Sequence, residues 1–138
     1  MSDQLTIFLM AAIKRPFLWG RSDCFILASE WIKQKTKQDI FAGYEFENNY
    51  NTSKGAVRLY RLYKFKSIEE IWEHFLTPVD VNKSQRGDIC VRKIAGFEMP
   101  ASGIVLDKGL SAFQSLKGLS LYPTGENAST YEVPPCLP

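Results

Sequence analysis

Residues 16–24 hold the groups best suited to chemistry, because the run Pro-Phe-Leu-Trp-Gly-Arg-Ser-Asp-Cys places a cysteine at the expected start of a helix. Unpaired backbone N–H groups and the positive end of the helix dipole stabilise a thiolate there, lowering the cysteine pKa from about 8.5. Asp23 precedes Cys24 at a position that suits a negative charge. The turn at Trp19 and Gly20 would form one wall of a groove beside the sulfur, or would simply be a packed turn.

The spacing of apolar residues after Ser22 predicts a helix over residues 22–37, with Ser22 as its N-cap. One buried face would carry Cys24, Leu27, Ala28, Trp31 and Ile32. The position of Cys24 therefore has two interpretations. It is a nucleophile at a helix start, or it is a small buried side chain that only packs.

Length and composition predict one globular domain over residues 1–133, followed by a loose tail over 134–138. The net charge of +2 is too small to indicate a protein that binds nucleic acid through its overall charge. The apolar run over residues 5–13 lacks a basic leader and is too short to span a bilayer, so we expect a protein made in the cytoplasm. Three cysteines without paired spacing and a single histidine predict no disulfide framework, no metal site and no cofactor.

Helix signals come first in the chain and strand signals come later. We expect helices over residues 4–14, 22–37 and 53–63, and a fourth from Ser67 that ends before Pro78. Strand-length apolar runs follow at residues 89–94, 103–106, 111–115 and 119–122. This order predicts an α+β domain, with N-terminal helices packed on a C-terminal antiparallel sheet of three to five strands.

Two neighbouring segments form a candidate docking face. The ordered loop over residues 38–52 is dense in aromatic side chains, namely Phe41, Tyr44, Phe46 and Tyr50. The following helix and turn carry five positive charges in thirteen residues with no acid among them: Lys54, Arg58, Arg61, Lys64 and Lys66. Such a run is either the solvated face of a helix or a contact face for an acidic partner.

Three further features have simple structural interpretations. His74 lies away from the apolar stripe of its helix, so we expect it to face solvent. The run Arg-Gly-Asp at residues 86–88 should be a turn that leads into a strand. Cys90 should pack within that strand, and Cys136 should be a tail thiol without a partner.

The order of these motifs resembles the NlpC-like branch of the papain-like cysteine peptidases. It resembles more closely a family of uncharacterised proteins encoded in phages and prophages, over residues 16–133. The shared motifs are Pro-Phe-x-Trp-Gly-Arg-x-Asp-Cys, Gly-Ala-Val-Arg at 55–58, Arg-Gly-Asp at 86–88 and Gly-Ile-Val-Leu at 103–106. The resemblance implies that Cys24 is the nucleophile position, Ser102 replaces the base histidine and Gln114 lies at the orienting position. A serine cannot accept the thiol proton near neutral pH.

The resemblance implies a role in a virus particle. We expect a tail-tip structural or assembly protein of a phage or gene-transfer particle, impaired in catalysis, that moves from the host cytoplasm into the virion and contacts other tail-tip or hub proteins. The alternative is an active cysteine amidase or endopeptidase that uses Cys24 to cut cell-wall peptide as DNA enters the host. A host-directed binding protein that uses the same cleft is a third possibility.

Overall fold

The computed structural model describes residues 3–94 and 99–134. Four α-helices come first in the chain: α1 (Gln4–Ala12), α2 (Cys24–Thr36), α3 (Ser53–Leu62) and α4 (Ile68–Phe75). Six strands follow: β1 (Thr77–Val79), β2 (Ile89–Arg92), β3 (Ala101–Val105), β4 (Leu110–Ser115), β5 (Gly118–Pro123) and β6 (Ser129–Glu132). Two short 3₁₀ helices, η1 (Val81–Lys83) and η2 (Thr124–Glu126), complete the order. The predicted α+β class is confirmed.

The strands form one open antiparallel sheet in the order β1-β6-β2-β3-β4-β5. The prediction of three to five strands was therefore wrong, because β1 and β6 were missed. β1 is an edge strand that contains Pro78, and an edge is where a sheet tolerates proline. β6 lies between β1 and β2, so the two missed strands extend the sheet at one side.

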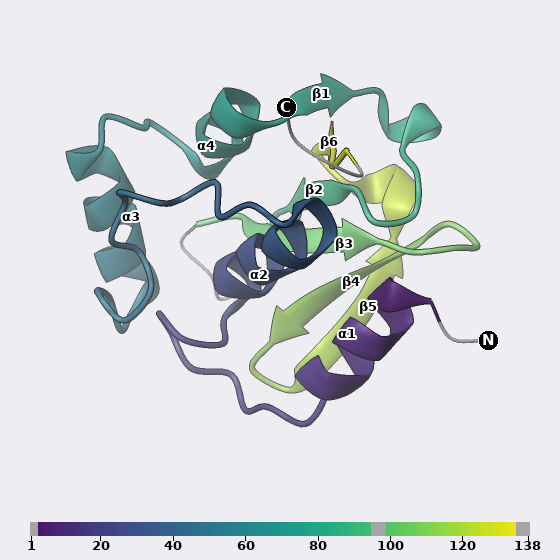
Figure 1. The fold of residues 1–138 in the computed structure, drawn as a ribbon, viewed down its shortest axis with the longest axis horizontal. Helices are drawn as coiled ribbons and strands as arrows, with labels where there is room; N and C mark the ends of the chain where they lie inside the picture. Colours follow the sequence, from purple (N-terminus) through teal and green to yellow (C-terminus); the bar gives the residue numbers. More distant parts are fainter. Residues whose placement is uncertain (1–2, 95–98, 135–138) are drawn as a thin grey trace.

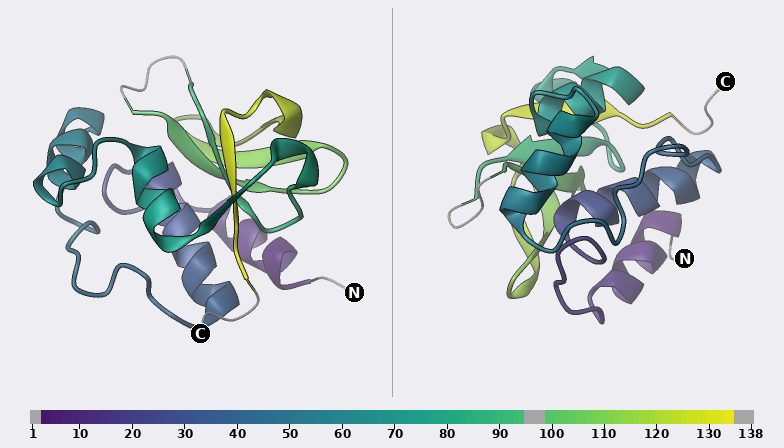
Figure 2. Two further views of the ribbon diagram at one scale, coloured as in Figure 1. Left: turned by 90° about the horizontal axis from the view of Figure 1, so that it is seen from above. Right: turned by 90° about the vertical axis from the view of Figure 1, so that its left-hand side faces the viewer.

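The helices are arranged around α2, which contacts α1 on one side and β3 and β4 on the other. Figure 1 and Figure 2 show α1 and α2 over the same face of the sheet, with α4 beside β1 at its upper edge. α3 lies at the periphery, at the left of Figure 1, away from the strands. α2 is thus the central helix, and its first residue is held against the sheet.

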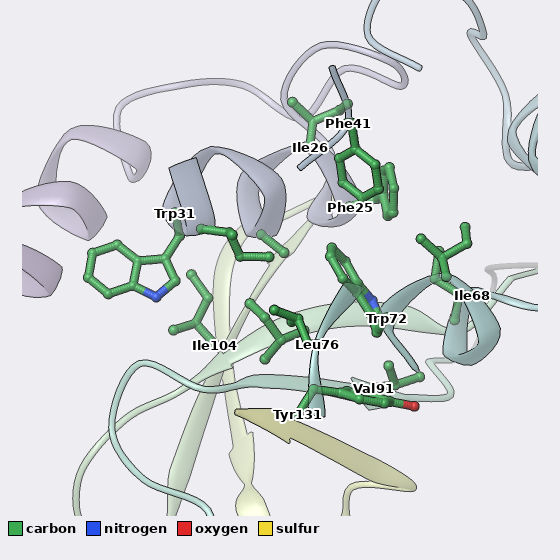
Figure 3. Close-up of a cluster of buried hydrophobic side chains, with 14 of the residues drawn as sticks. Phe25, Ile26, Trp31, Phe41, Ile68, Trp72, Leu76, Val91, Ile104 and Tyr131 are labelled. Atoms are coloured by element: carbon green, nitrogen blue, oxygen red, sulfur yellow. The ribbon is translucent and has the colours of Figure 1, made fainter. Parts of the chain in front are cut away.

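The core forms where α2 and α4 meet the sheet (Figure 3). All five residues of the predicted α2 stripe are buried. Phe25 and Ile26 are buried as well, because the loop after α2 folds back over the opposite side of the helix. The ring of Phe41 lies 5.3 Å from that of Phe25 and 5.8 Å from that of Trp72.

The aromatic half of the predicted docking face is therefore wrong. Phe41, Phe46 and Tyr50 are each at most 8% exposed, and Tyr44 is half-buried against them. A loop with this density of aromatic rings lowers its free energy by joining the core, since burying each large ring contributes about 1.5–3 kcal/mol. These residues belong to the core and do not form the exposed aromatic surface that the sequence predicted.

Candidate functional site

The start of α2 is fixed by Asp23, which is the N-cap and accepts a hydrogen bond from the backbone N–H of Ile26 at 2.9 Å. The prediction of Ser22 as N-cap was wrong. The Ser22 hydroxyl turns back and donates to the carbonyl of Pro16. Cys24 is consequently the first residue of the helix, which confirms the prediction that it lies in the first turn.

Asp23 also connects the turn before α2 to the aromatic loop. Its second carboxylate oxygen accepts from the Gly20 N–H at 2.7 Å and from the Tyr50 hydroxyl at 2.6 Å. Gly20 has a φ of +82°, and a Cβ there would lie 2.1 Å from the Tyr50 carbonyl oxygen. Burial raises the pKa of Asp23, and the hydrogen bonds oppose that rise. The conspicuous residues of this turn therefore build a buried structural junction.

The Cys24 thiol is buried. It is 1% exposed and belongs to a small cluster with Cys90, Ala101, Val105 and Phe113. Burial raises its pKa to about 12, and the charge of Asp23 adds to the rise. The prediction of a lowered pKa was wrong, because removal from water outweighs the favourable helix start when the sulfur is enclosed.

The structure brings Ser102 next to Cys24. The backbone of Ser102 favours the thiolate form of Cys24 and only partly opposes the rise in its pKa. The Ser102 side chain is 1% exposed, and its Oγ accepts a hydrogen bond from Nε1 of the fully buried Trp72 at 3.0 Å. The position that the resemblance assigns to a histidine is thus occupied by a hydroxyl covered by α4.

Gln114 lies on the same face of the sheet as Ser102. Ile104 pairs with Ala112 across the two strands, and side chains two residues apart on one strand point to the same face, so Ser102 and Gln114 share the face of that pair. Gln114 is 2% exposed. Its Nε2 donates a long hydrogen bond of 3.4 Å to the carbonyl of Arg15, while its Oε1 has no partner among the described residues. The side chain therefore ties β4 to the turn after α1.

Trp19 packs against the main hydrophobic core, and His74 lies at the surface. Trp19 is half-buried and packs edge-on against Phe17, with ring centroids 4.9 Å apart. His74 is exposed on α4, as predicted, and its ring contacts those of Phe65 and Phe75. Whether Trp19, Gly20 and Asp23 bind a ligand stays a prediction.

The Arg-Gly-Asp run is a structural turn. Arg86 is paired with Asp3 at 2.8 Å and with Asp107 at 3.0 Å. Gly87 has a φ of +95°, and the buried Asp88 accepts from the backbone N–H groups of residues 85 and 133. These contacts join α1, β2 and the end of the chain, so the prediction of a turn is confirmed.

Cys90 packs within β2 and is fully buried, as predicted. Burial raises the pKa of its thiol to about 12. Cys136 lies outside the described residues, as does all but the first residue of the predicted tail.

In the described part of the chain no group of three or more histidine, cysteine or acidic side chains could hold a metal ion. None of the described helices is long and apolar enough to cross a membrane.

A groove that the sequence did not predict runs along the outer side of α2, with a volume of about 530 Å³. Its apolar floor comes from Phe8, Ile26, Phe41 and Phe46, and its rim includes Glu30, Lys33, Asp39 and Glu47. Cys24, Ser102 and Gln114 do not line it. No local signal could have located it, because α1, α2 and the following loop meet there only in the folded chain.

In a comparison with known protein families, one family model matches residues 1–133 of the chain. The chain belongs to the family described as "Domain of unknown function (DUF6950)". No curated protein matches it.

Proposed function

We propose that this protein is a structural or assembly component of a phage tail tip, or of a related gene-transfer particle, built on an NlpC-like fold that has lost catalysis. The observation that carries the loss of catalysis is the enclosed state of Cys24, whose thiol has a pKa of about 12. The location in a particle rests on the motif resemblance.

Two features of the fold support the NlpC-like assignment. A cysteine begins the central helix, and that helix packs against β3. β3 lies between β2 and β4 in an antiparallel order, so Ser102 and Gln114 stand on neighbouring strands and share a face. An NlpC-like site needs its nucleophile, base and orienting residue in these places.

Two features argue against turnover at this site. A nucleophilic cysteine must reach the thiolate form and touch substrate, but Cys24 is 1% exposed. The neighbouring Ser102 hydroxyl cannot act as a base near neutral pH, and positioned proton transfer is worth about 10²–10⁴-fold in rate. The same fold would then serve as a rigid module for protein contacts.

The test combines an enzyme assay with particle analysis. Purified chain is incubated with peptidoglycan and the released muropeptides are analysed, using wild type, Cys24→Ala and, as a matched control, Cys90→Ala. Particles made from the genome that encodes the chain are purified and analysed by mass spectrometry. We expect no muropeptide release, presence of the chain in the particles, and normal particle yield with Cys24→Ala.

Release of muropeptides that disappears in Cys24→Ala but persists in Cys90→Ala would overturn the proposal in favour of a cysteine amidase or endopeptidase. Absence of the chain from purified particles would overturn the structural role.

A further inference from the structure

The outer side of α3 and the turn after it carry an exposed basic surface, which we call the basic face. It consists of Lys54, Arg58, Arg61, Lys64 and Lys66, all of which are exposed. Lys54, Arg58 and Arg61 are spaced at i, i+4 and i+7, so they form one stripe along the helix. α3 lies at the edge of the molecule, which leaves this stripe open to a partner (Figure 1).

Most charges of the basic face are not neutralised by a carboxylate among the described residues. Arg58, Arg61, Lys64 and Lys66 form no ion pair with any described residue, whereas Arg15 and Arg86 elsewhere are each paired with carboxylates. The chain as a whole carries a net charge of only +2, so the positive charge is concentrated here. Such a concentration attracts an acidic partner by electrostatic steering.

Apolar side chains lie between the charges. One shallow hollow is lined by Val57 and Leu62 together with Lys54, Arg58 and Arg61. A second is lined by Phe65 together with Arg61, Lys64 and Lys66. Leu62 is 71% exposed. The face therefore offers apolar contact area rimmed by arginine, and interfaces between proteins are enriched in arginine.

The aromatic rings of this region argue against single-stranded nucleic acid as the partner. Proteins that bind single strands stack bases on exposed aromatic rings. Here Tyr60 and Phe65 are 6% and 7% exposed and belong to the core. The half-buried Tyr63 uses its hydroxyl to accept from the backbone N–H of Glu45. The basic face therefore has positive charges but no exposed aromatic ring among Tyr60, Tyr63 and Phe65 on which a base could stack.

We propose that the basic face binds an acidic segment of a neighbouring protein, which inserts an apolar side chain beside Leu62 while its carboxylates pair with Arg58 and Arg61. This inference rests on the proposed function, because the neighbour is another protein of the particle. It narrows the predicted docking face to its basic part, because the aromatic side chains of the loop before α3 are buried in the core.

The binding test uses the full chain and defined probes. The first probe is a labelled amphipathic peptide with glutamate at i and i+4 and one leucine face. The second is the same peptide with serine in place of leucine, and the third is a single-stranded oligothymidine. The variants are Arg58→Glu/Arg61→Glu, Leu62→Ser and, as a control with the same charge change on exposed residues, Lys108→Glu/Lys117→Glu. Thermal unfolding checks that each variant is folded.

We expect the leucine peptide to bind wild type more tightly than the other probes. The Arg58→Glu/Arg61→Glu variant should weaken it by about tenfold or more, equivalent to about 1.4 kcal/mol, and the control pair by less than about twofold. Leu62→Ser should weaken the leucine peptide but not the serine peptide. Tighter binding of oligothymidine, equal loss in the control pair, or self-association that Arg58→Glu/Arg61→Glu abolishes would each overturn the proposal.

Particle incorporation separates this inference from the proposed function. If wild type enters particles and Arg58→Glu/Arg61→Glu does so equally well, the basic face is not the docking site and the proposed function stands. If wild type is absent from particles although the leucine peptide binds as expected, the particle role fails and the acidic-segment site stands.

Discussion

Chemical labelling of Cys24 tests directly whether its thiol is a packing group or a nucleophile. With a pKa of about 12, the thiolate fraction of Cys24 at pH 7.5 is about 3 × 10⁻⁵, against about 0.1 for a free cysteine of pKa about 8.5. Ionisation alone therefore slows alkylation about 3000-fold. Labelling through global unfolding is also slow, since a stability of 5 kcal/mol leaves about one molecule in 5000 open.

The assay follows iodoacetamide labelling by mass spectrometry in a Cys136→Ser variant, so that the tail thiol gives no signal. Cys90 is the internal control, because it is equally buried and its pKa is also about 12. We expect Cys24 and Cys90 to be protected alike in the native protein and to react at the free rate in denaturant. Labelling of native Cys24 within about tenfold of free cysteine, with Cys90 protected, would refute the reasoning.

Three further predictions concern the residues that enclose the site. Tyr50→Phe removes the hydroxyl that donates to Asp23, so urea denaturation should show a loss of about 1.5–3 kcal/mol near neutral pH. Since the folded pKa of Asp23 lies above its unfolded value, its contribution to stability is fully present below the unfolded pKa and falls as pH rises through the folded one. The Tyr50 hydroxyl opposes the rise in the pKa of Asp23 because it stabilises the ionised carboxylate, so the loss caused by Tyr50→Phe should shrink in acid, where this carboxyl is protonated. Ser102→Ala leaves a buried indole N–H without its acceptor, and the unfolding free energy should fall by about 1–3 kcal/mol. Gly20→Ala should prevent folding or lower the melting temperature far more than Gly43→Ala, because both have positive φ but only Gly20 faces a backbone oxygen; equal effects would contradict this.

Local signals were enough to predict most of the elements. The stripe of α2 is periodic, and the Ser67 capping of α4 is a short-range pattern, so both are encoded within a few residues. β1 and β6 were missed for a physical reason. The run Thr-Pro-Val is short and contains proline, so it becomes a strand only by pairing with β6. The run Ser-Thr-Tyr-Glu is mostly polar, and it becomes a strand only by pairing with β1 and β2.

The state of the candidate site depended on contacts distant in sequence. The place of Cys24 in the first turn of a helix was predicted, but its surroundings include Ser102 and residues of the smaller cluster up to Phe113. The N-cap was misassigned between two adjacent residues of types that both cap well. The observed cap, Asp23, also accepts a hydrogen bond from Tyr50, which is 27 residues away and therefore invisible to a local pattern. Burial of this kind sets the pKa of a thiol and cannot be read from local spacing.

The absence of a histidine and the enclosure of Cys24 are physically connected. Ser102 fits beneath α4 because its small hydroxyl accepts the Trp72 N–H, and Trp72 packs in turn against Phe25, the residue after Cys24. An imidazole at residue 102 would need the space that this contact uses, as well as access to water for proton exchange. On the proposed NlpC-like function, a Ser102→His change alone would therefore not produce a working catalytic pair with Cys24, because the imidazole would first have to displace a fully buried tryptophan from the core.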